Sequence, residues 1–120
     1  MNAINWFEIP TTDLARAQRF YEIVLETKLR NEDFGPTPMC IFEVPAPGVA
    51  GALIFTADRK PSSEGTLVYL NTGGAMNACL ARVTKAGGQV VMPRTDIGPP
   101  GFIALIRDPE GNVVGFHEER

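Results

Sequence analysis

Histidine is almost absent from this 120-residue sequence, which limits the metal chemistry open to a single chain. The only histidine is His117, close to the C-terminus. A metal triad of two histidines and one carboxylate therefore cannot be assembled within one subunit. Serine is also scarce, since Ser62 and Ser63 are the only two. The sequence therefore gives no support to a Ser-His-Asp catalytic triad.

Cysteine and glycine signatures of common sites are missing as well. Cys40 and Cys79 are the only cysteines, which is too few for a disulfide framework or a CxxC metal site. We expect both thiols to be buried and reduced. The pair Gly73-Gly74 precedes a predicted helix, but the further glycines of a dinucleotide fingerprint and the lysine of a P-loop are absent.

The charge balance and the apolar runs exclude two further classes of partner. The formal net charge is -3 and the pI is near 5.1, so no basic stripe is available for phosphates. We expect no nucleic-acid partner. No apolar run approaches the roughly 20 residues that span a bilayer, and the N-terminus lacks a signal-peptide pattern. We therefore expect no membrane partner and a cytoplasmic location.

The first half of the chain predicts a strand, a helix and three further strands. Residues 3–9 are rich in aromatic and β-branched types, and the polar run at 11–13 then offers a helix N-cap at Asp13. The apolar residues of the predicted helix fall on one 3.6-residue stripe. These are Leu14, Ala17, Tyr21, Val24 and Leu25. Three strands are predicted at about 28–33, 38–44 and 51–56, and the polar residues 58–65 are predicted to be a linker.

The second half repeats this order. A strand is predicted at 66–71, a helix from Ala75 to Ala86 that ends at Gly87-Gly88, and strands at about 89–93, 101–107 and 112–118. The chain is thus an internal repeat with a period near 62 residues, which makes residues 1–57 and 66–120 two modules of one domain. We predict an α+β fold of two βαβββ modules, in which a mixed eight-stranded sheet forms a cup and one helix per module packs outside it.

Several segments resemble one known superfamily. They are WFEIPTTDLARAQRFYEIVL at 6–25, LVYLN at 67–71, ACLARVTKAGGQVV at 78–91 and FIALIRDPEGNVVGFHEE at 102–119. This pattern is similar to that of the vicinal oxygen chelate superfamily, which includes glyoxalase I, bleomycin-resistance proteins and extradiol dioxygenases. Within it the chain resembles the small glyoxalase-like proteins. The resemblance implies a small-molecule ligand and a homodimer.

The resemblance also implies where a metal would be bound. Metal-dependent members place one ligand on the first and last strand of each module, and the ion polarises a carbonyl or holds an enediolate. The matching positions here are Trp6, Ala52, Leu67 and Gly115, none of which can ligate a metal. We therefore expect no metal and no other cofactor. A displaced metal site that uses Glu8 and His117, either within the chain or completed by a neighbouring subunit, stays open as an alternative.

Period-two alternation predicts which side chains face the cup. One set is expected to face it and the other to face the helices. The cup-facing set comprises Trp6, Glu8, Ala52, Ile54, Leu67, Tyr69, Asn71, Val113, Gly115 and His117. The helix-facing set comprises Phe7, Ile9, Leu53, Phe55, Val68, Leu70, Val114 and Phe116.

Two functions are compatible with this cup. In the first, the chain is a lyase or isomerase in which Glu8 is the general base and Asn71 or His117 orients the substrate. Trp6, Ile54, Leu67, Tyr69, Asn71 and Gly115 would then form the ligand-binding wall. In the second, the chain sequesters an aromatic or cationic compound without turnover. A structural ion pair at Glu8 and a dimer contact at His117 are the simpler interpretations of those two residues.

Overall fold

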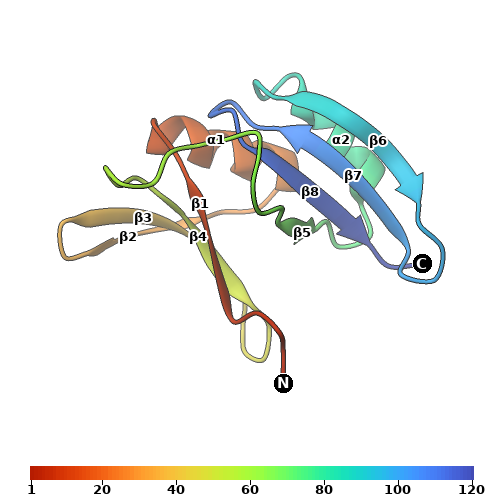
Figure 1. Cartoon of the computed structure of the whole chain (residues 1–120), viewed down its shortest axis with the longest axis horizontal. Helices are drawn as coiled ribbons and strands as arrows, with labels where there is room; N and C mark the ends of the chain where they lie inside the picture. The colour runs from red at the N-terminus through yellow and green to blue at the C-terminus, as the bar shows by residue number, and fades with distance from the viewer.

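The computed structural model describes residues 1–120 and divides the strands between two mixed sheets of four (Figure 1). The first module contains β1 (Trp6–Pro10), α1 (Leu14–Leu25), β2 (Arg30–Phe34), β3 (Thr37–Phe42) and β4 (Ala50–Ile54). Its strands lie in the order β1-β4-β3-β2, with β1 parallel to β4 and the other neighbours antiparallel.

The second module repeats this topology. It contains β5 (Tyr69–Asn71), α2 (Met76–Val83), β6 (Gln89–Asp96), β7 (Phe102–Arg107) and β8 (Val113–Glu118). The order β5-β8-β7-β6 again places the first strand parallel to the last. The predicted α+β fold of two βαβββ units is therefore confirmed.

The predicted single eight-stranded sheet is instead two four-stranded sheets. The reason lies in the edges that would have to meet, β1 and β5. Strand β5 is only three residues long, which leaves few backbone groups for pairing with a strand of the other module. The two modules are therefore joined by side-chain packing and loop contacts.

Local sequence signals explain the helix boundaries. Asp13 caps α1, because its side chain accepts a hydrogen bond from the backbone N–H of Arg16 at 3.0 Å. Helix α2 ends at Val83, three residues before the predicted end at Ala86. The intervening residues form a turn that closes at Gly87, whose φ of 105° favours glycine.

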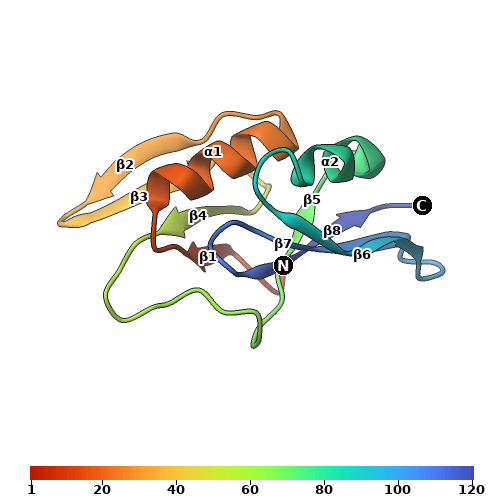
Figure 2. The ribbon, with the colours of Figure 1, turned by 90° about the horizontal axis from the view of Figure 1, so that it is seen from above.

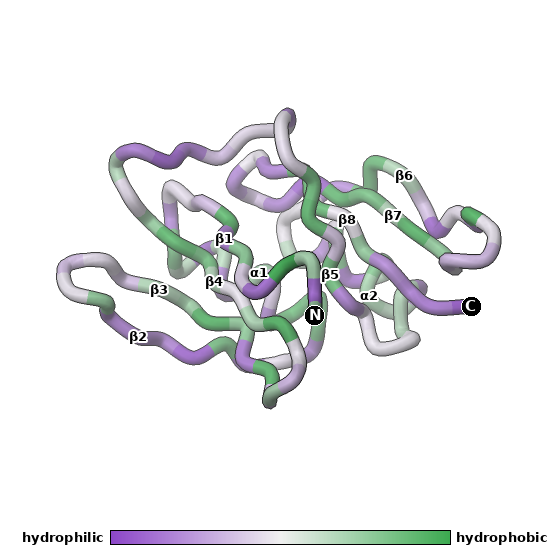
Figure 3. The backbone as a smooth tube through the Cα atoms, turned by 60° about the horizontal axis from the view of Figure 1, so that its bottom comes forward, coloured by the Kyte–Doolittle hydropathy of each residue, from purple (hydrophilic) through white to green (hydrophobic).

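The hydrophobic core lies between the helices and one face of the sheets. Figure 2 shows α1 and α2 on the same side of both sheets. The core includes Phe20, Tyr21 and Val24 of α1 and also Ile9, Leu53, Leu70, Val114 and Phe116 of the central strands. Phe55 was expected on this side, but it follows the end of β4 and is half exposed. The outer strand β2 is exposed throughout and hydrophilic (Figure 3).

The turn between β7 and β8 joins the second module to the first by hydrogen bonds. The carboxylate of Glu110 accepts hydrogen bonds from the backbone N–H groups of Thr12 and Asp13, both at 2.8 Å, and from Arg16 Nε at 2.6 Å. Burial opposes ionisation of Glu110, but the hydrogen bonds from Arg16, Asp13 and Thr12 outweigh it and lower its pKa. Glu110 therefore supports the N-terminus of α1 from the other module.

Two further side chains of this turn are buried at the same junction. The hydroxyl of Tyr21 donates to Asp108 Oδ2 at 2.6 Å, and Asn112 Nδ2 donates to the carbonyl of Pro10 at 2.8 Å. Burial raises the pKa of Asp108, although the hydrogen bonds from Tyr21 and Asn112 act in the opposite direction. Asn112 Oδ1 also accepts the backbone N–H of Ser62, which ties the segment between the modules to the same turn.

Candidate functional site

The face of β1 that points away from the helices carries Trp6 and Glu8. The indole Nε1 of Trp6 donates a hydrogen bond to Glu8 Oε2 at 3.2 Å, so these two side chains lie together. Glu8 pairs with Ala52 across the parallel β1–β4 register. The alternate residues of β1, Phe7 and Ile9, pack with the core. The alternation along β1 is thus the one that the sequence pattern predicts.

The rest of this face in the first module is filled by apolar side chains. Ala52 and Ile54 are buried in a small cluster with Ile41, against which Met39 packs. Ile54 is only 4% exposed, so it supports the wall from behind and offers little surface to a ligand. Glu8 is therefore the main polar side chain on this face of the first module.

In the second module, Tyr69, Asn71 and His117 line one cavity of about 400 Å³. Tyr69 pairs with Gly115 across the β5–β8 register, and the tyrosine ring covers the glycine. A Cβ atom at Gly115 would lie 2.3 Å from the ring, so only glycine fits beneath it. Leu67 precedes β5 and is partly exposed. The structure thus brings three predicted site residues together here.

His117 has a partner that the sequence did not indicate. Its Nε2 lies 2.8 Å from the carbonyl oxygen of Pro100 in the β6–β7 loop. Because a carbonyl only accepts, Nε2 carries the hydrogen in this contact. No hydrogen bond or ion pair joins His117 to Glu8, and the two residues line different cavities. The structure therefore does not bring the two predicted catalytic residues together.

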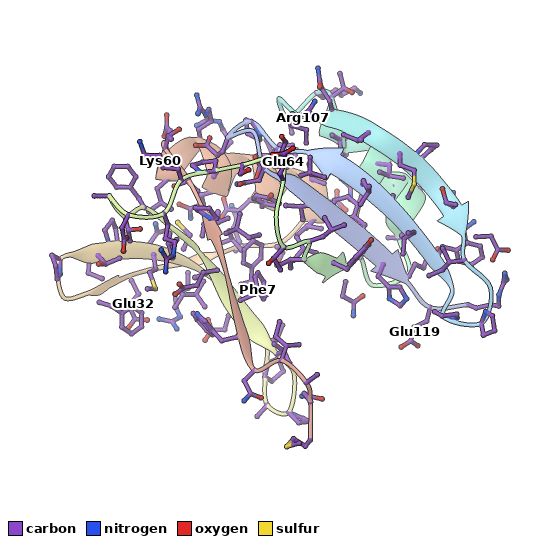
Figure 4. All side chains as sticks on the ribbon, in the orientation of Figure 1. Phe7, Glu32, Lys60, Glu64, Arg107 and Glu119 are labelled. Atoms are coloured by element: carbon purple, nitrogen blue, oxygen red, sulfur yellow. The ribbon has the colours of Figure 1, made fainter.

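Glu8 lines a cavity of about 220 Å³ together with residues of the segment between the modules. Its lining includes Lys60, Ser62 and Glu64, and Figure 4 labels Lys60 and Glu64 on the segment that passes beside β1. No sequence pattern indicates these residues, since a polar stretch with proline and glycine is typical of any linker. Their place depends on the Ser62–Asn112 hydrogen bond, which joins residues 50 positions apart.

A third cavity, of about 380 Å³, opens at the C-terminal end of α1 on the helix side. Its walls include Phe7, Phe42 and Leu70, with Glu26 and Glu43 also in the lining. Asn71 is the only predicted site residue among its lining residues. This cavity lies outside the face on which the sequence places the site.

The residues present do not fit the metal that the resemblance implies. Trp6, Ala52, Leu67 and Gly115 offer no ligating atom, and the ring of Tyr69 covers Gly115. No group of three or more histidine, cysteine, aspartate or glutamate side chains is placed to hold a metal ion. The displaced alternative with Glu8 and His117 lacks the convergence of those two side chains.

Comparison with known proteins assigns the chain to a family. The family model of the Glyoxalase/Bleomycin resistance protein/Dioxygenase superfamily matches residues 3–116. The chain therefore belongs to the Glyoxalase/Bleomycin resistance protein/Dioxygenase superfamily. No helix has the length and apolar character needed to cross a membrane.

Individual relatives agree with this assignment. The chain is 32% identical over 126 residues to CFP32 of Mycobacterium tuberculosis, provisionally named a glyoxylase. The match covers 93% of this chain but only 44% of CFP32, so the chain spans less than half of that relative. It is also 29% identical to a glyoxylase-like domain-containing protein of Didymella fabae, with 92% of this chain and 88% of that protein covered.

Solved structures share the fold at low sequence identity. The glyoxylase/bleomycin resistance protein/dioxygenase domain from Frankia sp. EAN1pec aligns with a TM-score of 0.71 at 17% identity, covering 100% of this chain and 99% of that one. A glyoxalase I mutant from Zea mays aligns with a TM-score of 0.70 at 18% identity, covering 95% of this chain and 45% of that one. At these identities the likeness concerns the fold alone.

Proposed function

We propose that this chain is a lyase or isomerase that moves a proton on a small organic substrate without a metal, with Glu8 as the general base. The observation that carries the proposal is the isolation of the Glu8 carboxylate on the helix-free face. Its only hydrogen-bond donor is the indole of Trp6, and no arginine or lysine forms an ion pair with it. A charged side chain held in this way beside a cavity is available to accept a proton.

The other residues on this face have supporting roles in the proposal. Trp6 orients the carboxylate through its indole hydrogen bond. Tyr69 and Asn71 line the separate cavity, where the aromatic ring of Tyr69 would contact larger or aromatic ligands and Asn71 would supply a polar contact. His117 is a positioning residue, because its ring holds the β6–β7 loop at Pro100. We further propose that the chain acts in the cytoplasm as a homodimer, for which light scattering should give twice the mass of one chain.

Exchange of acidic hydrogens tests the assignment of Glu8. Hydroxyacetone and dihydroxyacetone incubated with the protein in D₂O should lose their hydrogens next to the carbonyl, as followed by proton NMR. Glu8→Gln should slow this exchange about 100-fold, within the usual contribution of a general base. Glu64→Gln is the matched control, since Glu64 lines the same cavity from the other side and should be dispensable. Equal loss in both variants would reject Glu8 as the single base.

Binding without turnover is the second candidate function. It is favoured by the separation of Glu8 from the cavity that holds Tyr69, Asn71 and His117. A flat or cationic ligand against Tyr69 would need no carboxylate at Glu8. The same Glu8→Gln variant distinguishes the two candidate functions. If the chain only binds its ligand, the variant keeps its affinity for benzyltrimethylammonium, and no ketone exchanges its hydrogens. Metal analysis of protein purified without added ions would show whether a displaced site exists.

A further inference from the structure

Lys60 is the one cationic side chain in the wall of the Glu8 cavity. It lies on the segment between the modules, which is fixed near this point by the Ser62 N–H to Asn112 Oδ1 hydrogen bond of 3.0 Å. The next turn of this segment is held by the hydroxyl of Ser62, which accepts the backbone N–H of Glu64 at 3.0 Å. The cavity is thus lined in part by a tethered, exposed stretch of chain that carries an ammonium group.

The ammonium group of Lys60 is not used by the protein itself. It forms no ion pair with Glu8, with Glu64 or with any other carboxylate, and no hydrogen bond to it is formed. The cavity of about 220 Å³ is therefore lined by Glu8 from β1 and by Lys60 from the segment between the modules, and neither side chain has an ion-pair partner. A ligand in this cavity can contact both groups.

A base alone is not sufficient for proton removal next to a carbonyl. The C–H electron pair becomes the new C=C bond and the carbonyl π pair moves onto oxygen, which must be stabilised as it gains charge. A positive group on the far side of the substrate from the base meets this requirement. We infer that Lys60 is that group and that it takes the electrophilic role which a metal ion fills in other enzymes of this type. This inference rests on the proposed function of Glu8.

The step balances without any further reactant. Glu8 accepts the proton from the carbon next to the carbonyl, and Lys60 donates a hydrogen bond to the enolate oxygen. The protonated Glu8 then returns the proton to the former carbonyl carbon. At the same time the proton of the substrate hydroxyl passes to the enolate oxygen, so the old carbonyl becomes a hydroxyl, the old hydroxyl becomes a carbonyl, and the isomerisation is complete. No oxidant, reductant or water is consumed, and Lys60 remains an ammonium throughout.

The size and lining of the cavity define the substrate class. Pockets for drug-sized ligands are about 300–1,000 Å³, and this cavity of about 220 Å³ is smaller. Ser62 and Thr66 add hydroxyl groups to its wall. The substrate class is therefore a short α-hydroxy carbonyl compound of a few non-hydrogen atoms. Larger aromatic compounds belong to the separate cavity at Tyr69.

Two measurements separate the role of Lys60 from that of Glu8. The first is the exchange of hydroxyacetone in D₂O, which Lys60→Met should slow about 100-fold because one transition-state donor is lost. The second is binding of oxalate, a planar dianion that resembles an enediolate, followed by the fluorescence of Trp6, the only tryptophan. Lys60→Met should weaken oxalate about fivefold, as expected for one partly exposed charge contact, and Lys60→Arg should retain it.

Controls and opposite outcomes are well defined. Lys28→Met removes an exposed lysine from the α1–β2 connection and should change neither measurement. Glu8→Gln should slow exchange about 100-fold, whereas oxalate should bind at least as well, because a like charge has been removed. If Lys60→Met keeps both exchange and oxalate affinity while Glu8→Gln loses exchange, the inference is overturned and the proposed function stands. If the unmodified protein exchanges none of the ketones, both are overturned.

Discussion

The two modules share equivalent hydrogen bonds but carry different side chains at equivalent positions. The hydroxyl of Thr11 donates to the carbonyl of Ile54 at 2.9 Å, and the hydroxyl of Thr72 donates to that of His117 at 3.5 Å. Because these two contacts are equivalent, they align the residues of one module with those of the other. Three positions before the threonine, the first module has Glu8, which pairs with Ala52. At the equivalent position the second module has Tyr69, which pairs with Gly115.

The difference between Glu8 and Tyr69 shows how a repeat acquires an asymmetric site. Ala52 opposite Glu8 has a methyl group, whereas Gly115 opposite Tyr69 leaves room for an aromatic ring to lie flat. One module therefore offers a carboxylate and the other an aromatic surface at the same place in the frame. The two half-sites therefore differ chemically at these two pairs of positions.

The helices differ in the same asymmetric way. Helix α1 is supported at its N-terminus by Glu110 of the other module, whereas α2 receives Glu118 of its own module, whose Oε1 accepts the Met76 N–H at 3.1 Å. Glu110→Ala should therefore cost about 3 kcal/mol in the free energy of unfolding, because it removes a buried carboxylate with several charged or backbone partners. Urea denaturation at pH 7 measures this loss.

The pH dependence gives an internal check on Glu110. Its folded-state pKa is lowered from the ordinary value of 4.5, so its contribution is present above that pH and is lost as the pH falls through the folded pKa. Glu110→Gln should make stability less sensitive to acid in this range. Glu118→Ala is the matched control within one module and should have the smaller effect. A larger loss from Glu118→Ala would contradict the idea that Glu110 couples the modules.

Sequence reasoning recovered the frame because the frame depends on local patterns. Alternation placed Ile9, Leu53, Leu70 and Phe116 toward the helices, where the structure has them. It was wrong for Phe55, because alternation holds only inside a strand and β4 ends at Ile54. Turn residues and caps were equally local signals, so the order of strands and helices followed from them.

The candidate site was less accessible to sequence reasoning because it depends on how the two sheets are placed. Glu8 and His117 face the same side of the fold but line different cavities, because they belong to separate sheets. The hydrogen bond of His117 to Pro100 requires the path of the β6–β7 loop. Lys60 was missed because the position of its segment is set by a contact between Ser62 and Asn112. Such long-range contacts leave no periodic signal.

Substituting Gly115 tests the claim that a small residue permits the aromatic half-site. Gly115→Ala should destabilise the fold by about 2 kcal/mol, because the new Cβ would lie 2.3 Å from the ring of Tyr69. The double variant Gly115→Ala, Tyr69→Ala should recover most of that loss, as expected when two residues in contact are coupled. Chemical denaturation of the four proteins of this cycle gives the coupling energy. Additive losses would show that the ring moves aside freely.

The smallest expected loss of stability is at His117. This residue is equivalent to Ile54 of the first module, because each carbonyl accepts the hydroxyl of the equivalent threonine. Ile54 packs in an apolar cluster, whereas His117 holds the β6–β7 loop through Pro100. His117→Ala should therefore cost only about 1 kcal/mol, the usual value of one hydrogen bond that is open to solvent. Amide hydrogen exchange should show faster exchange in the loop around Gly98 and Gly101, with the core strands unchanged. Because His117 only positions this loop, ketone exchange by Glu8 should persist, and its complete loss would give the imidazole a direct role in proton transfer.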